Sequence, residues 1–214
     1  MFRFDTRSVL LAQPLEDLPW LEHGFGTRLS VDWPAAHGLA TLKQIHSNTV
    51  LAADRPGLIG EGDTLITNQP GILLSVRTAD CLPILIADPV HRAIAAVHAG
   101  WRGTALEILP KTIRAMRERF DSLPEDLVVV VGPGIGGCCF EVGPEVAEQF
   151  GRSGRTKIDL IETLRRQVGR NDGAPRQFGS AGLCTVCRAD LFHSYRRDRD
   201  AAGRMLSVIG IRGS

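Results

Sequence analysis

The sequence has no apolar run long enough to cross a membrane, and it has no excess of either charge. Its longest apolar stretch, residues 71–100, is interrupted by Arg77, Asp80, Asp88 and Arg92, whereas a membrane helix needs roughly 20 mostly apolar residues. The chain has 25 basic and 24 acidic residues and a net charge of +1. A balance this close to neutral gives no general attraction to nucleic acid or to a membrane surface. We therefore expect neither of these partners.

Cysteine is also scarce, and the count is odd. Five cysteines in 214 residues do not suggest a disulfide framework, because a chain of this length buries enough apolar surface to fold without cross-links. Residues 1–7 contain no apolar stretch of the signal-peptide type, so we expect a reduced, cytoplasmic setting. The hydrophobic content of 43% is that of an ordinary globular protein. We expect one domain over residues 1–214, as a monomer or a weak homodimer.

Short apolar runs separated by turn signals indicate buried strands. These runs lie at 72–76, 83–87, 93–98 and 127–131, with weaker candidates at 49–53, 63–67 and 205–211. The sequence predicts helices at 104–119, 144–150, 157–168 and 188–196, and Pro110 marks a kink or a restart in the first of them. Residues 169–182 are the most loop-like segment. This mixture predicts an α/β (α+β) fold with a mixed β-sheet core flanked by helices.

One cysteine and two histidines lie beside predicted strands and have the chemistry of a metal site. Cys81 precedes Leu82-Pro83, where proline interrupts strand hydrogen bonding. His98 ends one apolar run, and His46 precedes another. Two imidazoles and a thiolate suit zinc and leave a fourth position for water or substrate. The separations of 35 and 17 residues match no local metal motif, so a buried structural thiol, a core histidine and a surface histidine remain alternatives.

Several arginines are candidates for binding an anion. Arg102 follows Gly100-Trp101 at the start of a predicted helix, where free backbone amides favour negative charge and the guanidinium would add a forked contact. Arg77 lies four residues before Cys81, and a further basic cluster lies at 195–199. In each case a solvated surface arginine is the simpler alternative.

The glycine-rich turn and the other cysteines give weaker signals. The turn at 132–142 lacks the Lys-Ser/Thr end of a P-loop and the spacing of a dinucleotide fingerprint. The adjacent Cys138 and Cys139 would point to opposite faces of a strand, which argues against their binding one metal. Cys184 and Cys187 have the CxxC spacing, but a structural zinc site needs a second ligand pair, and the sequence shows no obvious one.

A series of motifs along nearly the whole chain resembles one family. The two most specific are Thr78-Ala79-Asp80-Cys81 and His98-Ala99-Gly100-Trp101-Arg102-Gly103, and others lie at 23–28, 44–46, 62–67, 132–135, 139–142 and 192–198. Through these motifs the chain resembles the YfiH-like laccase-domain family, also called multicopper polyphenol oxidase or purine nucleoside phosphorylase proteins. Residues 152–182 depart from the family pattern, because they are rich in arginine and glycine where members usually carry a Lys/Leu-rich helical segment.

The resemblance implies a compact fold similar to the catalytic domain of cytotoxic necrotizing factors. It also implies phosphorolysis of purine nucleosides, including methylthioadenosine, and deamination of adenosine, so purine nucleosides and phosphate are the expected partners. The trio His46, Cys81 and His98 would hold Zn²⁺, with Cu²⁺ as the alternative metal. The expected site therefore comprises catalytic His46, Cys81, His98 and Asp80, and substrate- or phosphate-binding Gln44, Asp63, Arg77 and Arg102.

Several chemistries remain open on these residues. Deamination needs an activated water and a carboxylate that carries its proton, for which Asp80 and Asp63 are candidates, whereas phosphorolysis would place phosphate near Arg102 or Arg77. Without a metal, Cys81 would be a nucleophile and His98 its base, as in thiol hydrolases. Copper-dependent phenol oxidation could use a His-Cys-His set, but the four remaining histidines form no His-x-His pair. A regulatory protein that binds metal or nucleotide without turnover is the non-enzymatic alternative.

Overall fold

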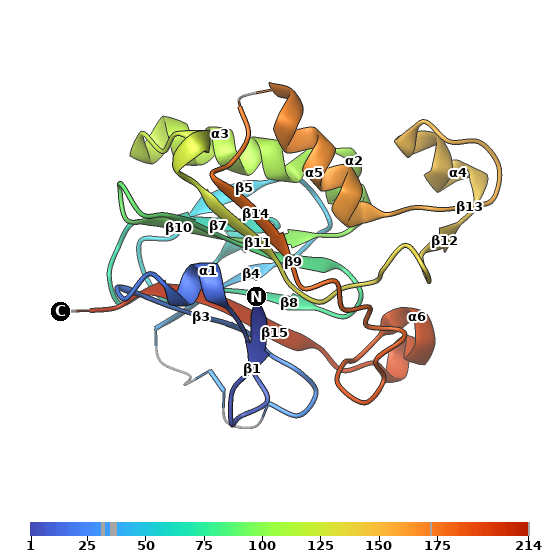
Figure 1. The fold of residues 1–214 in the computed structure, drawn as a ribbon, viewed down its shortest axis with the longest axis horizontal. Coiled ribbons are helices and arrows are strands. Elements are labelled where there is room, and N and C mark those ends of the chain that lie inside the picture. The colour runs from blue at the N-terminus through green and yellow to red at the C-terminus, as the bar shows by residue number, and fades with distance from the viewer. Residues whose placement is uncertain (31–32, 35–37, 172, 214) are drawn as a thin grey trace.

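The computed structural model describes residues 1–30, 33–34, 38–171 and 173–213. These residues form three layers, in which a seven-stranded sheet packs against a six-stranded sheet and helices cover the outer face of the second sheet (Figure 1). Both sheets contain parallel and antiparallel pairs. The predicted α/β fold with a mixed-sheet core flanked by helices is confirmed, and the core holds two such sheets rather than one.

The seven-stranded sheet contains β8, the strand that precedes Cys81. Its order is β1-β2-β3-β15-β8-β4-β6. The strands are β1 (Phe2–Phe4), β2 (Leu10–Ala12), β3 (Leu21–Phe25), β15 (Met205–Ile211), β8 (Leu73–Thr78), β4 (Leu39–Lys43) and β6 (Gly57–Glu61). β4 runs parallel to β8 and to β6, and the other neighbours are antiparallel. Because β8 ends at Thr78, Cys81 lies just beyond the end of this strand.

The six-stranded sheet is the central layer, and its order is β14-β11-β9-β10-β7-β5. The strands are β14 (Gln177–Ser180), β11 (Val128–Val131), β9 (Leu82–Asp88), β10 (Ala93–Ala99), β7 (Thr64–Thr67) and β5 (Val50–Ala52). Every residue of β9, β10 and β11 is buried. A sheet covered on both faces produces continuous apolar runs instead of alternation, which is why the sequence predicted these three strands correctly.

Apolar side chains on the two faces of the central sheet form two cores. Leu85 and Ile94 pack toward the seven-stranded sheet, where they meet residues such as Leu74. Ile84 and Val97 belong to the core on the other face, which the helices close. The central sheet is therefore held from both sides, and the ends of its strands are fixed positions from which side chains can be aimed.

The helices are short except for the two that cover the central sheet, α3 and α5 (Figure 1). The α-helices are α1 (Gln13–Glu16), α2 (Trp101–Ala105), α3 (Ile108–Phe120), α4 (Pro144–Ala147), α5 (Leu160–Asn171) and α6 (Tyr195–Asp198), and the 3-10 turns are η1 (Pro124–Asp126), η2 (Glu148–Phe150) and η3 (Arg199–Ala201). The predicted helix 104–119 is two helices, because Glu107 adopts a left-handed conformation with φ of 56°. Pro110 then falls in the first turn of α3, where its missing N–H breaks no helical hydrogen bond.

Two other helix predictions need correction. The helix predicted at 157–168 begins later, at Leu160, because β13 (Thr156–Lys157) pairs with β12 (Glu141–Val142). The helix predicted at 188–196 is wrong over most of its length. Ser194 caps α6 by accepting a hydrogen bond from the Arg197 amide, so helix starts only at Tyr195. The segment predicted as the most loop-like, 169–182, contains the end of α5 and all of β14.

The prediction that Cys138 and Cys139 point to opposite faces is also wrong. These residues lie in a turn, in which the amides of Cys139 and Phe140 both donate to the carbonyl of Gly136, so the alternation of a strand does not apply. Both sulfur atoms approach Cys187, with Sγ–Sγ distances of 3.7 Å from Cys138 and 3.5 Å from Cys139. The CxxC motif therefore has the second cysteine pair that the sequence did not reveal.

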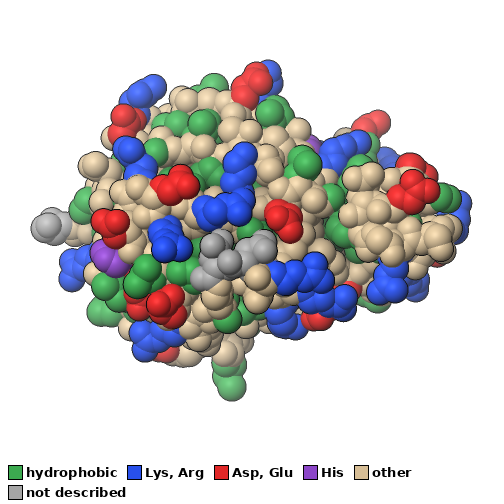
Figure 2. Space-filling model, turned by 90° about the horizontal axis from the view of Figure 1, so that it is seen from above, with side chains coloured by type: hydrophobic (Ala, Val, Ile, Leu, Met, Phe, Trp, Pro, Cys, Tyr) green, Lys and Arg blue, Asp and Glu red, His purple; other side chains and the backbone are tan. Residues whose placement is uncertain are grey.

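The face that carries α3 and α5 contains charged side chains of both signs, interspersed with apolar ones (Figure 2). This mixture agrees with the near-neutral net charge of the sequence. Within the described part of the chain, every helix is too short or too polar to traverse a bilayer.

Candidate active site

Two loops and the end of one strand bring His46, Cys81 and His98 together. His46 lies between β4 and β5, Cys81 between β8 and β9, and His98 near the end of β10. β9 and β10 pair so that His98 lies opposite Pro83 and Ala99 opposite Leu82, which places His98 beside the strand that Cys81 precedes. The ligand atoms of the trio all lie within 4.8 Å of one another. The structure thus joins three residues that the sequence separates by 52 positions.

The trio runs from the surface into the interior. His46 is exposed, Cys81 is half-buried and His98 is only 3% exposed. The two imidazole rings lie edge to face, with centroids 4.9 Å apart. Gly100 makes this packing feasible, because a Cβ atom there would lie 3.0 Å from the Cys81 Sγ and 3.2 Å from the His46 ring. His46 is exposed and all three residues line one pocket, so a small ligand can reach the sulfur and the imidazoles from the His46 side.

The fully buried carboxylate of Asp63 forms hydrogen bonds to two residues of the trio, His98 and His46. One oxygen pairs with Nδ1 of His98 at 2.8 Å and accepts the His46 amide at 3.0 Å. The other accepts the amide of Ser47 at 2.6 Å and its hydroxyl at 2.7 Å. The Asp63 carbonyl also accepts the His98 amide at 2.8 Å. Asp63 was expected to contact substrate, but in the structure its oxygens fix the positions of His46 and His98.

Electrostatics couple these groups. Burial opposes ionisation of Asp63, but hydrogen bonds from His98 and Ser47 outweigh it and lower the pKa of the carboxyl to about 2. Burial also disfavours charged His98, but hydrogen bonds to Asp63 and Cys81 raise its pKa to about 9. Burial raises the pKa of the Cys81 thiol, whereas hydrogen bonds and charges from His46 and His98 lower it to about 7. Near neutral pH, thiolate and imidazolium therefore stabilise each other.

Asp80, the expected catalytic carboxylate, has a left-handed backbone with φ of 86° and is 8% exposed. Its Oδ1 accepts the Thr185 hydroxyl and its Oδ2 accepts the Arg196 amide, both at 2.6 Å. Its carbonyl accepts the Ile135 amide at 2.7 Å. Asp80 therefore fixes the loop that carries Cys81 to two segments that are distant in sequence, and the residue also lines the pocket described next.

A pocket of about 1080 Å³ opens over the trio. It is large enough for a nucleoside together with phosphate, because ligand pockets typically measure roughly 300–1,000 Å³. Of the predicted site residues, it is lined by Gln44, His46, Arg77, Asp80, Cys81, His98 and Arg102. Asp63 is not among the residues that line it, in keeping with its complete burial.

The two predicted arginines border this pocket in different ways. The Gln44 side chain holds the backbone of Arg77 by donating to its carbonyl at 2.9 Å and accepting its amide at 2.8 Å. Gln44 thereby extends the pairing of β4 with β8 and places Arg77 at the pocket wall. The Arg102 guanidinium lies over the Trp101 ring, 4.4 Å from its centroid, where the ring face attracts the cation, and both residues line the pocket.

Sequence reasoning found only part of the pocket wall. The lining residues that it had not assigned to the site include Phe140, Glu141, Glu145, Tyr195, Arg196, Arg199 and Arg204. The basic cluster at 195–199 was a signal for three of them. Arg196 reaches back to donate to the Glu141 carbonyl at 2.9 Å, a contact between positions 55 residues apart. Arg204 carried no sequence signal, because a lone arginine before a strand is ordinary.

The donor set fits a soft or borderline metal ion. Asp63 occupies Nδ1 of His98 and so leaves Nε2 as the atom available to a ligand. A carboxylate behind a histidine is the usual support of a metal-binding imidazole. Two imidazoles and one thiolate match zinc with an open fourth position. The Cys81 and His98 pair with Asp63 also resembles a cysteine–histidine–carboxylate arrangement for nucleophilic catalysis.

Comparisons with known proteins agree on one family. Residues 27–212 match the family described as multi-copper polyphenol oxidoreductase laccase. A Deinococcus radiodurans protein named purine nucleoside phosphorylase is 42% identical over 188 residues, which are 83% of this chain and 72% of the relative. A Clostridium acetobutylicum protein of the same name is 37% identical over 83% of this chain and 79% of its own. The crystal structure of Bacillus licheniformis hypothetical protein YfiH superposes with a TM-score of 0.89 at 27% identity and covers 99% of both chains.

We predict that alkylation of Cys81 in metal-stripped protein follows a titration with a midpoint near pH 7, because the thiolate is the nucleophile and its pKa is about 7. The His98→Ala variant should move the midpoint up toward the ordinary value of 9.0. Iodoacetamide labelling is read by mass spectrometry on tryptic peptide 78–92, in which Cys81 is the only cysteine. An identical midpoint in both proteins would refute the coupling.

Proposed function

Because the chain belongs to the multi-copper polyphenol oxidoreductase laccase family, we propose that it acts on purine nucleosides, cleaving them with phosphate and also deaminating adenosine. Methylthioadenosine is a further proposed phosphorolysis substrate. The observation that carries the proposal is the convergence of His46, Cys81 and His98 in a pocket bordered by several arginines. The relatives named purine nucleoside phosphorylase support the same substrate class.

His46, Cys81 and His98 would hold the metal, and zinc is the ion that their donor set suits best. Zinc bound there would supply Lewis-acid chemistry and lower the pKa of a coordinated water to about 7. The chain's own contribution is orientation, because Asp63 fixes the His98 ring and the His46 backbone. Gly100 keeps the space beside the sulfur open.

For phosphorolysis, the arginines at the pocket wall would bind phosphate. Arg77 and Arg102 present forked guanidinium groups suited to phosphate oxygens, and Arg196, Arg199 and Arg204 add positive charge around the same pocket. A phosphate oxygen forms the new bond to C1′ of the sugar as the bond to the purine nitrogen breaks, and the purine leaves with the electron pair and takes up a proton. Bound phosphate lies close to the positive charge that develops on the sugar and stabilises it.

Aromatic side chains in the pocket offer a surface for the purine. Trp101, Phe140 and Tyr195 all line it, and aromatic faces stack on nucleobases at about 1–3 kcal/mol per base. For deamination, water adds at C6 and ammonia leaves. We assign the accompanying proton transfer to Asp80, because it borders the pocket while Asp63 lies behind His98.

Phenol oxidation by several copper ions has less support. In the described residues, three or more metal-ligating side chains converge at two places, the trio and a cluster of four cysteines. His91 instead pairs with Asp88 at 2.8 Å, and His23 accepts the Ala12 amide at 2.9 Å. A multicopper centre needs further histidines close to one another, so we place oxidation below nucleoside chemistry.

A metal-independent thiol hydrolase is the second candidate, and one observation favours it. The Cys81 thiol has a pKa of about 7 beside a histidine that Asp63 orients, which are the properties of a nucleophile with its base. Cys81 would attack the substrate carbonyl, and His98 would hold the thiol proton for the leaving group. Full hydrolase activity after complete removal of metal would favour this alternative over the zinc-dependent enzyme.

We predict that Cys81→Ala lowers turnover of adenosine and inosine by more than about 10³-fold, because it removes both a metal ligand and the thiolate. Chromatography of adenosine incubations with and without phosphate gives the reaction, since adenine formed only with phosphate means phosphorolysis and inosine means deamination. His91→Ala is the control histidine variant away from the pocket and should retain activity. Unchanged rates in folded Cys81→Ala would exclude the proposed function.

We predict that Asp63→Asn weakens zinc binding at the trio by about 10–100-fold, the usual effect of losing a carboxylate behind a metal-binding histidine. The amide keeps the size of the side chain but removes the charge that supports the His98 ring. Competition with a chromophoric chelator measures the affinity, with Cys184→Ser and Cys187→Ser in both proteins so that the four-cysteine cluster does not contribute, and circular dichroism checks the fold. Equal affinities for both proteins would show that Asp63 does not support the metal site.

A further inference from the structure

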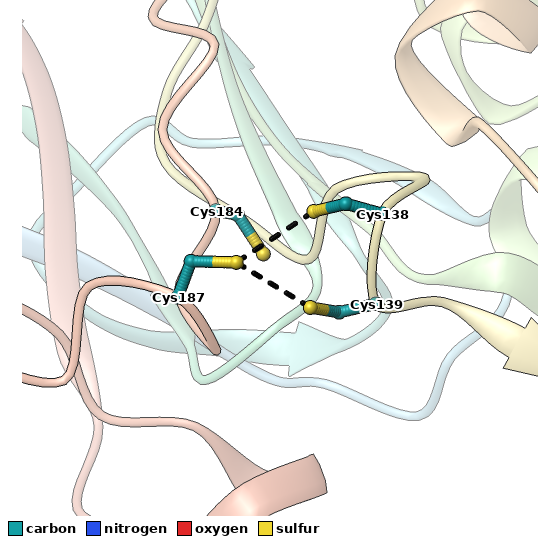
Figure 3. Close-up of side chains that lie close together, drawn as sticks. All are labelled: Cys138, Cys139, Cys184 and Cys187. Carbon is teal, nitrogen blue, oxygen red and sulfur yellow. Dashed lines mark hydrogen bonds between the residues drawn. The ribbon is translucent and has the colours of Figure 1, made fainter.

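A second cluster of reactive side chains lies apart from the trio. Cys138 and Cys139 come from the turn after β11, and Cys184 and Cys187 come from a turn that precedes α6. Figure 3 shows the four side chains pointing inward toward one another from these two turns. All four sulfur atoms lie within 4.8 Å of one another. Neither the proposed nucleoside chemistry nor any predicted site uses these residues.

The spacing of the sulfurs matches a metal site better than it matches disulfides. The Sγ of Cys187 lies 3.7 Å from that of Cys138 and 3.5 Å from that of Cys139. With Zn–S bonds of about 2.3 Å, the edge of a tetrahedral four-sulfur site measures about 3.8 Å. A disulfide instead needs about 2.05 Å between sulfurs, and all four cysteines are free.

The cluster is largely open to solvent, and a backbone amide contacts one of its sulfur atoms. Cys138 and Cys187 are exposed, and Cys139 and Cys184 are half-buried, so burial of apolar surface does not account for their meeting. The amide of Gly136 donates to the Sγ of Cys184 at 3.3 Å, as backbone amides do around sulfur ligands. A Cβ at Gly136 would come within 3.2 Å of the Cys138 Sγ, so glycine leaves the sulfurs room to converge.

We propose that Cys138, Cys139, Cys184 and Cys187 bind one zinc ion in a closed four-thiolate site. Sites of this composition are structural, because four protein ligands leave no position for substrate. The adjacent pair is compatible with such a site because its turn, unlike a strand, directs both side chains to the same point.

The zinc site ties together the two turns that hold the Cys81 loop. Gly134 and Cys184 form a β-bridge, and the Thr185 amide donates to the Gly134 carbonyl at 3.0 Å. Thr185, inside the CxxC motif, donates its hydroxyl to Asp80, and Ile135 donates its amide to the Asp80 carbonyl. The cluster therefore connects two of the three partners of Asp80, Thr185 and Ile135, and Asp80 directly precedes Cys81.

The test is zinc content by mass spectrometry of protein purified with a reductant and without chelator. Cys184→Ser with Cys187→Ser should lose about one equivalent of zinc relative to the parent chain, and His46→Ala with Cys81→Ala should retain about one equivalent. The two double variants are matched, so loss of metal from the trio cannot be mistaken for loss from the cluster. A trio variant without zinc, or iron in place of zinc, would overturn the proposal.

A labelling experiment on the unmodified chain covers the case in which the cluster variant fails to fold. Bound zinc should protect peptides 120–152 and 177–188, which carry the two cysteine pairs, from alkylation at neutral pH, and a strong chelator should abolish the protection. Equal labelling with and without chelator, or disulfides within these peptides under reducing conditions, would contradict a zinc site.

Discussion

The buried carboxylate of Asp63 is the constraint on which the site depends. A charge removed from water needs partners, and Asp63 finds them in two segments, because it binds the His98 ring near the end of β10 and the His46 amide and Ser47 on the loop after β4. Satisfying that one group therefore fixes an imidazole at the end of a central strand and a second imidazole on a loop. The same interaction occupies Nδ1 of His98 and leaves Nε2 free for a ligand. One contact therefore fixes both the position of the ring and the nitrogen that it offers.

The opposite side of the site depends on a second acidic residue. Asp80 connects the Cys81 loop to Thr185, Ile135 and the start of α6. The two turns that contact Asp80 also carry the four cysteines. The proposed zinc would therefore hold these two turns together. The trio thus lies between a carboxylate that aims the histidines and a loop anchor that aims the sulfur.

Sequence reasoning predicted the buried strands well and the tertiary contacts less well. Strands β9, β10 and β11 could be read because both of their faces are covered, which leaves a continuous apolar run in the sequence. His46, Cys81 and His98 could be named from residue chemistry and family motifs. The burial of Asp63, the Asp80 contact with a residue 105 positions away and the shared turn of Cys138 and Cys139 depend on how distant segments meet. Local pattern does not encode such contacts, and for the same reason the helix expected at 188–196 was misplaced.

The most direct test of this account is a crystal structure of the zinc-loaded protein with anomalous diffraction at the zinc edge. It should show an anomalous peak about 2.0–2.1 Å from one imidazole nitrogen each of His46 and His98 and about 2.3 Å from the Cys81 Sγ, with Asp63 still on Nδ1 of His98. Density without a peak among these three residues, or with the Cys81 side chain turned away from both imidazoles, would contradict it.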